Sequence, residues 1–217
     1  MRAPLAEEAL RLGRLLVQLL PAESETHALL ALMELHGSRN AARRGANGEA
    51  VLLPDQNRSL WDNVRIQRGL TALEDAQRHG GGTKTYALQA AIAACHMRAR
   101  AAEETDWDQI VHLYDELLRI NPSPVVALNR AVAVGMAQGP ASGLTELDQA
   151  AALCDGGCAF TGHPLFSSVR GDLLIKLGRF AEASVEIERA LATTMNLRER
   201  ELLEKRLKQM ERASFQS

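Results

Sequence analysis

The sequence predicts an all-α protein of about ten helices. Ala and Leu dominate its 217 residues and only 4% of them are aromatic, a composition that favours helix over strand. Apolar side chains recur at helical spacing in most segments, as at Ile110, Leu113, Leu117 and Leu118. Because Gly and Pro interrupt these segments at intervals, we expect the helices to be joined by short turns.

The helices are predicted to form repeated pairs. Residues 177–183 have the pattern of the turn between the two helices of a tetratricopeptide unit, since Gly178 suits a left-handed helix end and Ala183 is small where helices cross. Ile110 takes the place of Ala183 in a second copy, and Leu144 follows it by 34 residues, the tetratricopeptide period. We therefore predict a tetratricopeptide-like right-handed superhelix of about ten helices in antiparallel pairs.

We predict one domain over residues 1–217. Its expected segments are an N-terminal helix pair (1–44), an irregular loop (45–62), helical repeats (63–195), and a capping helix with a tail (196–217). The loop lacks helical period and contains the turn signal Asn47-Gly48. Within it, Val51–Leu53 either forms a small strand or pins the loop onto the helices. Long irregular insertions in compact helical folds often carry function.

Charge and hydropathy exclude several classes of function. The formal net charge is -2, so the basic excess of a nucleic-acid-binding domain is missing and we expect no direct binding of DNA or RNA. The short basic runs Arg39–Arg44 and Arg98–Arg100 are interpreted as solvated helix ends or loops. No uncharged apolar stretch approaches the length of about 18 residues that a membrane span needs. Irregularly spaced cysteines do not indicate an extracellular disulfide framework, so we expect a cytoplasmic protein.

No catalytic pattern is found in the sequence. The six histidines form no HxH or HExxH motif, and no phosphate-binding loop or nucleophile elbow follows a predicted strand. Cys154, Cys158 and His163 could hold a metal, but their spacing is not that of a zinc knuckle and a fourth ligand is not evident. Cys95 and His96 are expected to be buried in an Ala-rich helix. We predict no catalytic residue, no metal and no cofactor. An enzyme that acts on a small ligand in a groove is kept as an alternative hypothesis, after the two protein-binding hypotheses given below.

Polar residues beside Trp61 make the loop the first candidate site. Asp55, Gln56 and Arg58 closely precede this aromatic residue in the sequence. They either dock a partner chain, or they tie the loop down through an Asp–Arg pair while Trp61 packs into the core. The acidic run 103–106 precedes a helix, where carboxylates favour the positive end of the helix dipole, so we expect it to cap that helix rather than to bind a ligand.

A second group of candidates lies on the first helices of the repeats. In such solenoids the first helix lines the concave surface, where Asn129 and Arg130 could bind a peptide backbone or a carboxylate. Gln89 has the same role in the preceding unit, and simple solvent exposure is the alternative for all three. The predicted partner-binding residues are therefore Asp55, Gln56, Arg58, Trp61, Gln89, Asn129 and Arg130.

Two motifs, Asp55-Gln56-x-Arg58-x-x-Trp61 and Asn129-Arg130, are the most specific elements of a wider resemblance. The other stretches that carry it are 8–16, 29–43, 86–96, 105–107 and 122–133. From about Leu5 to Leu207, the chain resembles the C-terminal extension of a group of extracytoplasmic-function (ECF) RNA polymerase sigma factors. In that group a tetratricopeptide-like domain follows the two sigma regions. Asn57 departs from the family, in which an acidic residue is expected at this position.

The resemblance implies a regulatory role in transcription initiation, with the sigma regions or the RNA polymerase core as partners. The chain starts at Met1 almost directly in the extension, without the polymerase-binding region and the promoter-reading helix-turn-helix that precede it in the family. We therefore expect a fragment or a stand-alone homologue that does not direct polymerase to a promoter by itself. The alternative is a stand-alone tetratricopeptide-like scaffold that binds an unrelated protein.

Overall fold

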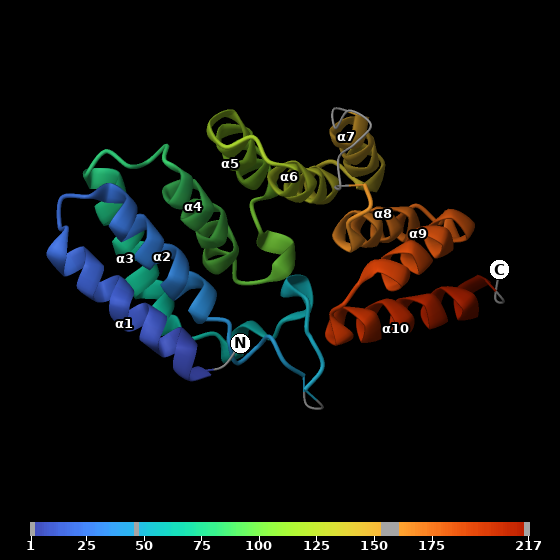
Figure 1. Cartoon of the computed structure of the whole chain (residues 1–217), viewed down its shortest axis with the longest axis horizontal. Coiled ribbons are helices and arrows are strands. Elements are labelled where there is room, and N and C mark those ends of the chain that lie inside the picture. Colours follow the sequence, from blue (N-terminus) through green and yellow to red (C-terminus); the bar gives the residue numbers. More distant parts are fainter. Residues whose placement is uncertain (1–2, 46–47, 153–160, 215–217) are drawn as a thin grey trace. The chain divides into compact units, whose positions relative to one another are not determined.

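The structure is a computed structural model that describes residues 3–45, 48–152 and 161–214 (Figure 1). These residues form ten α-helices and three short 3-10 helices. They contain no β-strand, and the β-structure among them is an isolated bridge between Arg44 and Ala50. The predicted all-α class is confirmed. The chain divides into two compact units, residues 1–122 and 123–217. That the two make one domain stays a prediction.

The first unit is built around its second helix. α2 packs along α3 and α4, while α1 packs against α2 and α5 packs against α4. The close approach of α3 to α2 requires Gly69, since a Cβ there would lie 2.7 Å from the Cγ atom of Leu35. The helices of this unit are α1 (Ala3–Leu19), α2 (Ser24–Gly37), α3 (Asn63–Arg78), α4 (Thr85–Arg98) and α5 (Trp107–Ile120).

Aspartate side chains begin two of these helices. Asp62 accepts hydrogen bonds from the backbone N–H groups of Val64 and Arg65 and so caps α3. Asp106 accepts one from Gln109 at 2.9 Å and caps α5. The prediction that the acidic run 103–106 caps a helix is thus confirmed for its last residue.

An irregular insertion, residues 38–62, joins α2 to α3. It contains two short 3-10 helices, η1 (Leu53–Asp55) and η2 (Arg58–Leu60). The segment Val51–Leu53 therefore forms no strand, and Leu53 packs against the apolar core of the unit, which is the second of the two alternatives predicted for it. Asn47 of the predicted turn lies outside the described residues.

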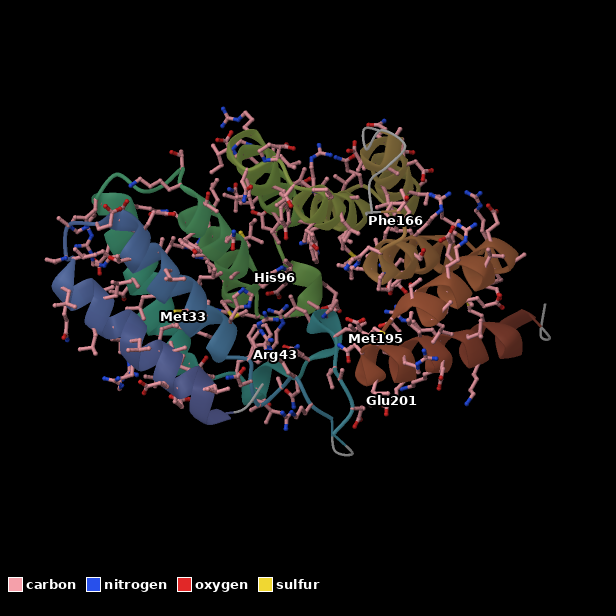
Figure 2. All side chains as sticks on the ribbon, in the orientation of Figure 1. Met33, Arg43, His96, Phe166, Met195 and Glu201 are labelled. Carbon is pink, nitrogen blue, oxygen red and sulfur yellow. The ribbon has the colours of Figure 1, made fainter. Side chains whose placement is uncertain are left out.

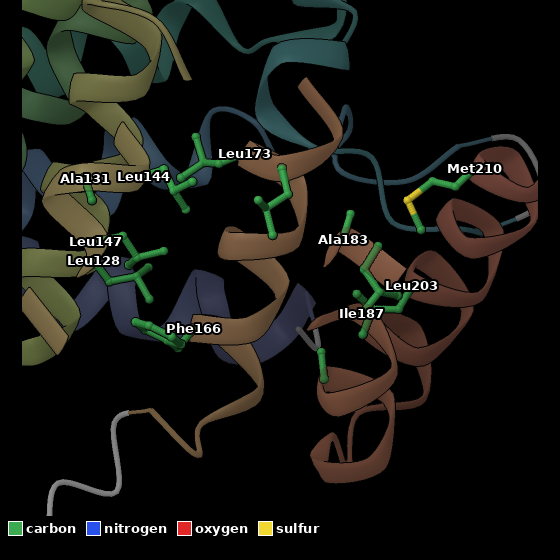
Figure 3. Packing of buried hydrophobic residues seen from close by; sticks show 12 residues of the cluster. Leu128, Ala131, Leu144, Leu147, Phe166, Leu173, Ala183, Ile187, Leu203 and Met210 are labelled. Carbon is green, nitrogen blue, oxygen red and sulfur yellow. The ribbon is translucent and has the colours of Figure 1, made fainter. Parts of the chain in front are cut away.

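The second unit consists of consecutive helix pairs. α6 packs against α7, α8 against α9, and α10 against α9. Their apolar side chains form one continuous core, which Figure 3 shows from Leu128 and Phe166 to Ile187 and Met210. The helices are α6 (Pro124–Ala137), α7 (Pro140–Ala152), α8 (Pro164–Lys176), α9 (Phe180–Thr193) and α10 (Leu197–Ser214).

The turn from α8 to α9 has the geometry expected of a repeat. Gly178 takes a left-handed backbone with φ of +72°, and Arg179 N–H donates to the Leu174 carbonyl at 3.0 Å, which closes the end of α8. Ala183 is fully buried at the crossing. The prediction of a tetratricopeptide-like turn at 177–183 is confirmed.

The α6–α7 crossing provides a test of the packing. We expect Gly143→Ala to lower the free energy of unfolding by about 1–3 kcal/mol, because the added Cβ would lie 2.7 Å from Gly135 Cα and 2.9 Å from the Ala131 carbonyl oxygen. Gly82→Ala is the control, since its Cβ would meet only Gln77 Cγ at 3.9 Å. Urea unfolding followed by far-UV circular dichroism measures both. Equal stability of the two variants would contradict this close helix contact.

Candidate functional site

Arg58 connects the insertion to the C-terminal end of α4. Its Nη1 donates to the carbonyl oxygens of His96 at 2.6 Å and Ala99 at 2.8 Å, and its Nη2 donates to Thr105 Oγ1 at 3.5 Å. The guanidinium also lies over the Trp61 ring, 4.5 Å from its centroid. Because the carbonyls at a helix C-terminus carry partial negative charge, a cation is favourable there. Arg58 thus caps α4 and holds η2 in place.

Two of the other predicted loop residues are buried. Trp61 is 5% exposed and packs in the apolar core of the first unit, as the structural alternative predicted. Gln56 is 7% exposed and donates from Nε2 to the Val51 carbonyl at 3.1 Å. Asp55 faces solvent, and Arg58 is bonded to α4 instead of forming the expected pair with it. Of the four loop residues, Asp55 and the partly exposed Arg58 are accessible to a partner.

Arginine and histidine side chains gather where the insertion meets the ends of α2 and α4. We call this group the arginine cluster; it consists of His36, Arg39, Arg43, Arg58 and His96, of which Arg43 and His96 are labelled in Figure 2. Arg39 Nη2 lies 2.9 Å from His36 Nδ1, and Arg43 Nη2 lies 3.4 Å from the same atom. Since a guanidinium only donates, His36 Nδ1 must accept, and the ring is neutral.

Burial and neighbouring positive charges lower the pKa values of His96 and Arg39. Burial first, and then the charges of Arg39 and Arg58, lower the pKa of His96 from 6.5 to about 4. Burial, followed by Arg43 and Arg58, lowers the pKa of Arg39 to about 10. Arg39 therefore keeps its charge at neutral pH although it is only 8% exposed. Among the described residues, no carboxylate forms a salt bridge with any of the three arginines.

This cluster was not predicted from the sequence. The run Arg39–Arg44 was interpreted as solvated, and that interpretation is wrong for Arg39, which is buried, and for Arg43, which is half-buried. The physical reason is tertiary: the chain turns back at the end of α2, so side chains that follow the helix are covered by the insertion. One sequence signal was present, because residues 38–48 contain three arginines and no acidic residue. Arg98 and Arg100 are exposed, as predicted.

The remaining predicted residues lie elsewhere. Asn129 and Arg130 are half-buried on α6 of the second unit, and Arg130 forms a salt bridge with Glu146 of α7. Gln89 is half-buried on α4, about two turns before the His96 end. The insertion residues and Gln89 thus belong to the first unit, and Asn129 and Arg130 belong to the second.

A cavity of about 620 Å³ lies between α1, α2 and α3. Its floor includes Glu34, which is 1% exposed and accepts from Arg14 Nη2 at 2.5 Å. His27, also in its lining, contacts the Pro21 carbonyl through Nε2 at 2.8 Å. Glu34 Oε1 and His27 Nε2 are thus hydrogen-bonded within the fold, whereas Glu34 Oε2 is buried and has no hydrogen-bond partner among the described residues.

Cys154 and Cys158, which the sequence analysis considered as metal ligands, lie outside the described residues. Within the described ranges, no three His, Cys, Asp or Glu side chains are placed to hold a metal ion. Cys95 is buried, as predicted. In the same portion of the chain, no helix is both long and apolar enough to cross a bilayer.

Comparison with known proteins identifies relatives without a stated activity. Residues 1–77, which include the whole insertion, match a family of unknown function, DUF6596. An uncharacterized protein of Rhizobium meliloti (strain 1021) is 45% identical over 197 residues, which are 91% of this chain and 45% of that protein. The chain thus spans less than half the length of this relative. No solved structure matches the chain.

Loss of the Arg58 anchor should destabilise the first unit. We expect Arg58→Ala to lower the free energy of unfolding by about 1–3 kcal/mol, because three oxygen acceptors lose their donor. Asp55→Ala removes a charge from the same segment but from an exposed side chain, so its effect should stay within about 0.5 kcal/mol. Chemical unfolding measures both. If the two variants are equally stable, Arg58 is not the anchor.

Burial of His96 should make the stability depend on pH. Because the folded pKa of His96 lies at about 4, below the unfolded value of 6.5, its neutral form stabilises the fold above pH 6.5, and this stability is lost as the pH falls towards 4. The loss is at most about 3 kcal/mol. His36 has the same lowered pKa but is exposed, so water screens its effect. We expect His96→Gln to flatten the decline of unfolding free energy between pH 7 and pH 4.5; parallel curves would contradict this role of His96.

Proposed function

We propose that this chain is a regulatory protein-interaction module of an ECF-type RNA polymerase sigma factor and acts in transcription initiation. It binds the sigma regions or the polymerase core in the cytoplasm and controls their activity. It makes no direct contact with DNA, and it is not an enzyme.

The observation that carries the proposal is the pairing of helices in both units. Stacked helix pairs present extended surfaces that bind other protein segments. The link to sigma factors rests on the resemblance of the insertion motif and of the Asn129-Arg130 segment. The Rhizobium meliloti relative supports it indirectly, because more than half of its length lies outside the matched region, which leaves room for sigma regions.

The test uses that relative, since both halves of the interaction can be produced from one protein. We expect its matched segment, expressed alone, to bind the remainder of the same protein or the RNA polymerase core in isothermal titration calorimetry. This chain should compete for that binding. Binding to neither partner would contradict the proposal and favour the alternative, a free-standing scaffold for an unrelated protein.

Variants of α6 then locate the contact. We expect Asn129→Ala combined with Arg130→Ala to weaken the binding by about tenfold or more, without changing the far-UV circular dichroism spectrum. Glu146→Gln is the matched control, because it breaks the salt bridge to Arg130 but keeps the arginine. If the control weakens binding as much as the double variant, Arg130 acts through the fold and the assignment of α6 as the contact is wrong.

A further inference from the structure

We propose that the arginine cluster is a phosphate-binding site. A phosphate group, free or as a monoester, lies between Arg39 and Arg43 and accepts hydrogen bonds from their Nε–H groups. All residues of the site belong to the first unit. Such a site goes beyond the proposed function and does not depend on it.

Arg39 carries a charge that nothing in its surroundings balances. Buried charged groups in proteins are nearly always paired, because removing a charge from water is strongly unfavourable. Arg39 is 8% exposed, and its Nη2 contacts the neutral ring of His36 at 2.9 Å, which supplies no negative charge. Its Nε is buried and has no hydrogen-bond partner. The side chain thus offers a buried N–H and a full positive charge.

Arg43 repeats this arrangement. Its Nη2 lies within 3.4 Å of the same His36 ring, so the two guanidiniums converge on one residue. The Nε of Arg43 is also buried and has no hydrogen-bond partner. Two buried N–H donors on converging guanidiniums require acceptors, and an oxyanion provides several acceptor atoms together with the opposite charge.

Carbonyl groups at helix ends and nearby carboxylates offset only part of the positive charge of the arginine cluster. Arg58 donates to carbonyls at the end of α4 and interacts with the charges of Glu103 and Glu104. Arg43 reaches the His36 carbonyl at 3.4 Å. Arg39 has neither kind of partner among the described residues. Its charge therefore identifies the centre of the site.

Phosphate fits the cluster better than a carboxylate does. The charges of Arg43 and Arg58 lie close enough to Arg39 to lower its pKa, and a dianion offsets more of this repulsion than a single carboxylate. A tetrahedral phosphate also presents oxygens in several directions, so it can accept from Arg39 and Arg43 together. Once bound, it joins Arg39 to Arg43 and so stabilises the start of the insertion.

The experiment uses the full chain at fixed ionic strength. Inorganic phosphate, glycerol 3-phosphate, succinate and sodium chloride are compared by thermal unfolding, and the phosphates also by isothermal titration calorimetry. We expect a saturable rise in Tm with phosphate and a smaller or no rise with succinate and chloride. Glycerol 3-phosphate distinguishes the two sources: tighter binding than inorganic phosphate indicates a monoester, and weaker binding indicates the free ion. Either order supports a phosphate site.

Three variants assign the effect to the cluster. Arg43→Gln should weaken phosphate binding by about tenfold or more. Arg44→Gln is the matched control, because it removes the same charge one position along from an exposed side chain, and it should bind as the wild type does. Arg39→Met removes the unpaired buried charge, so we expect a higher Tm without phosphate and no further rise when phosphate is added.

Several results would overturn the proposal. An equal rise in Tm with chloride would mean that general screening stabilises the chain, and a preference for succinate would assign the site to carboxylates of a protein partner. Equal phosphate affinities of Arg43→Gln and Arg44→Gln would mean that phosphate does not bind to the arginine cluster. Should Arg39→Met fail to fold, the comparison of Arg43→Gln with Arg44→Gln still decides.

Discussion

Paired helices approach closely only where a small residue stands at their crossing, and both units depend on this constraint. Gly69 lets α3 lie against Leu35 of α2, Gly143 meets Gly135 between α6 and α7, and Gly171 packs against α9. Because the backbones are so close, Ala and Leu side chains fill the space between helices and large aromatic residues are seldom needed. The low aromatic content is therefore a consequence of the packing, and each pair forms a firm base for the segments that leave it.

The insertion is held by one of these helix pairs. It begins and ends on the tightly packed α2–α3 pair, and its two ends are themselves joined, since Asp62 N–H donates to the Ser38 carbonyl at 2.9 Å. Trp61 anchors one end in the core, and Arg58 reaches across to α4. A loop closed in this way loses little further entropy when it binds. The insertion can therefore present side chains as precisely placed as those of a helix, although the helices in its described part are only two short 3-10 turns.

Features encoded by neighbouring residues could be predicted from the sequence, and features made by tertiary contacts could not. The helices and the turn at Gly178 follow from local spacing, which is why they were predicted. The place of Trp61 was left open, because an aromatic residue beside polar ones fits a docking loop as well as a core. That Arg130 faces a binding groove stays a prediction. Its salt bridge to Glu146 joins residues on two helices, so the pattern of a single helix could not show it. Arg39 was misjudged for the same reason.

In the arginine cluster, the buried charge of Arg39 is unfavourable for stability. A chain with a formal charge of -2 contains enough carboxylates to pair its arginines, yet Arg39 is buried without one. A buried residue that served stability alone would be better apolar at this position, so the unpaired charge favours a binding role. If phosphate and a protein partner both bind to the insertion, thermodynamic linkage requires each to change the affinity of the other by the same factor. Phosphate would then regulate the binding of the protein partner, and the partner would regulate the binding of phosphate.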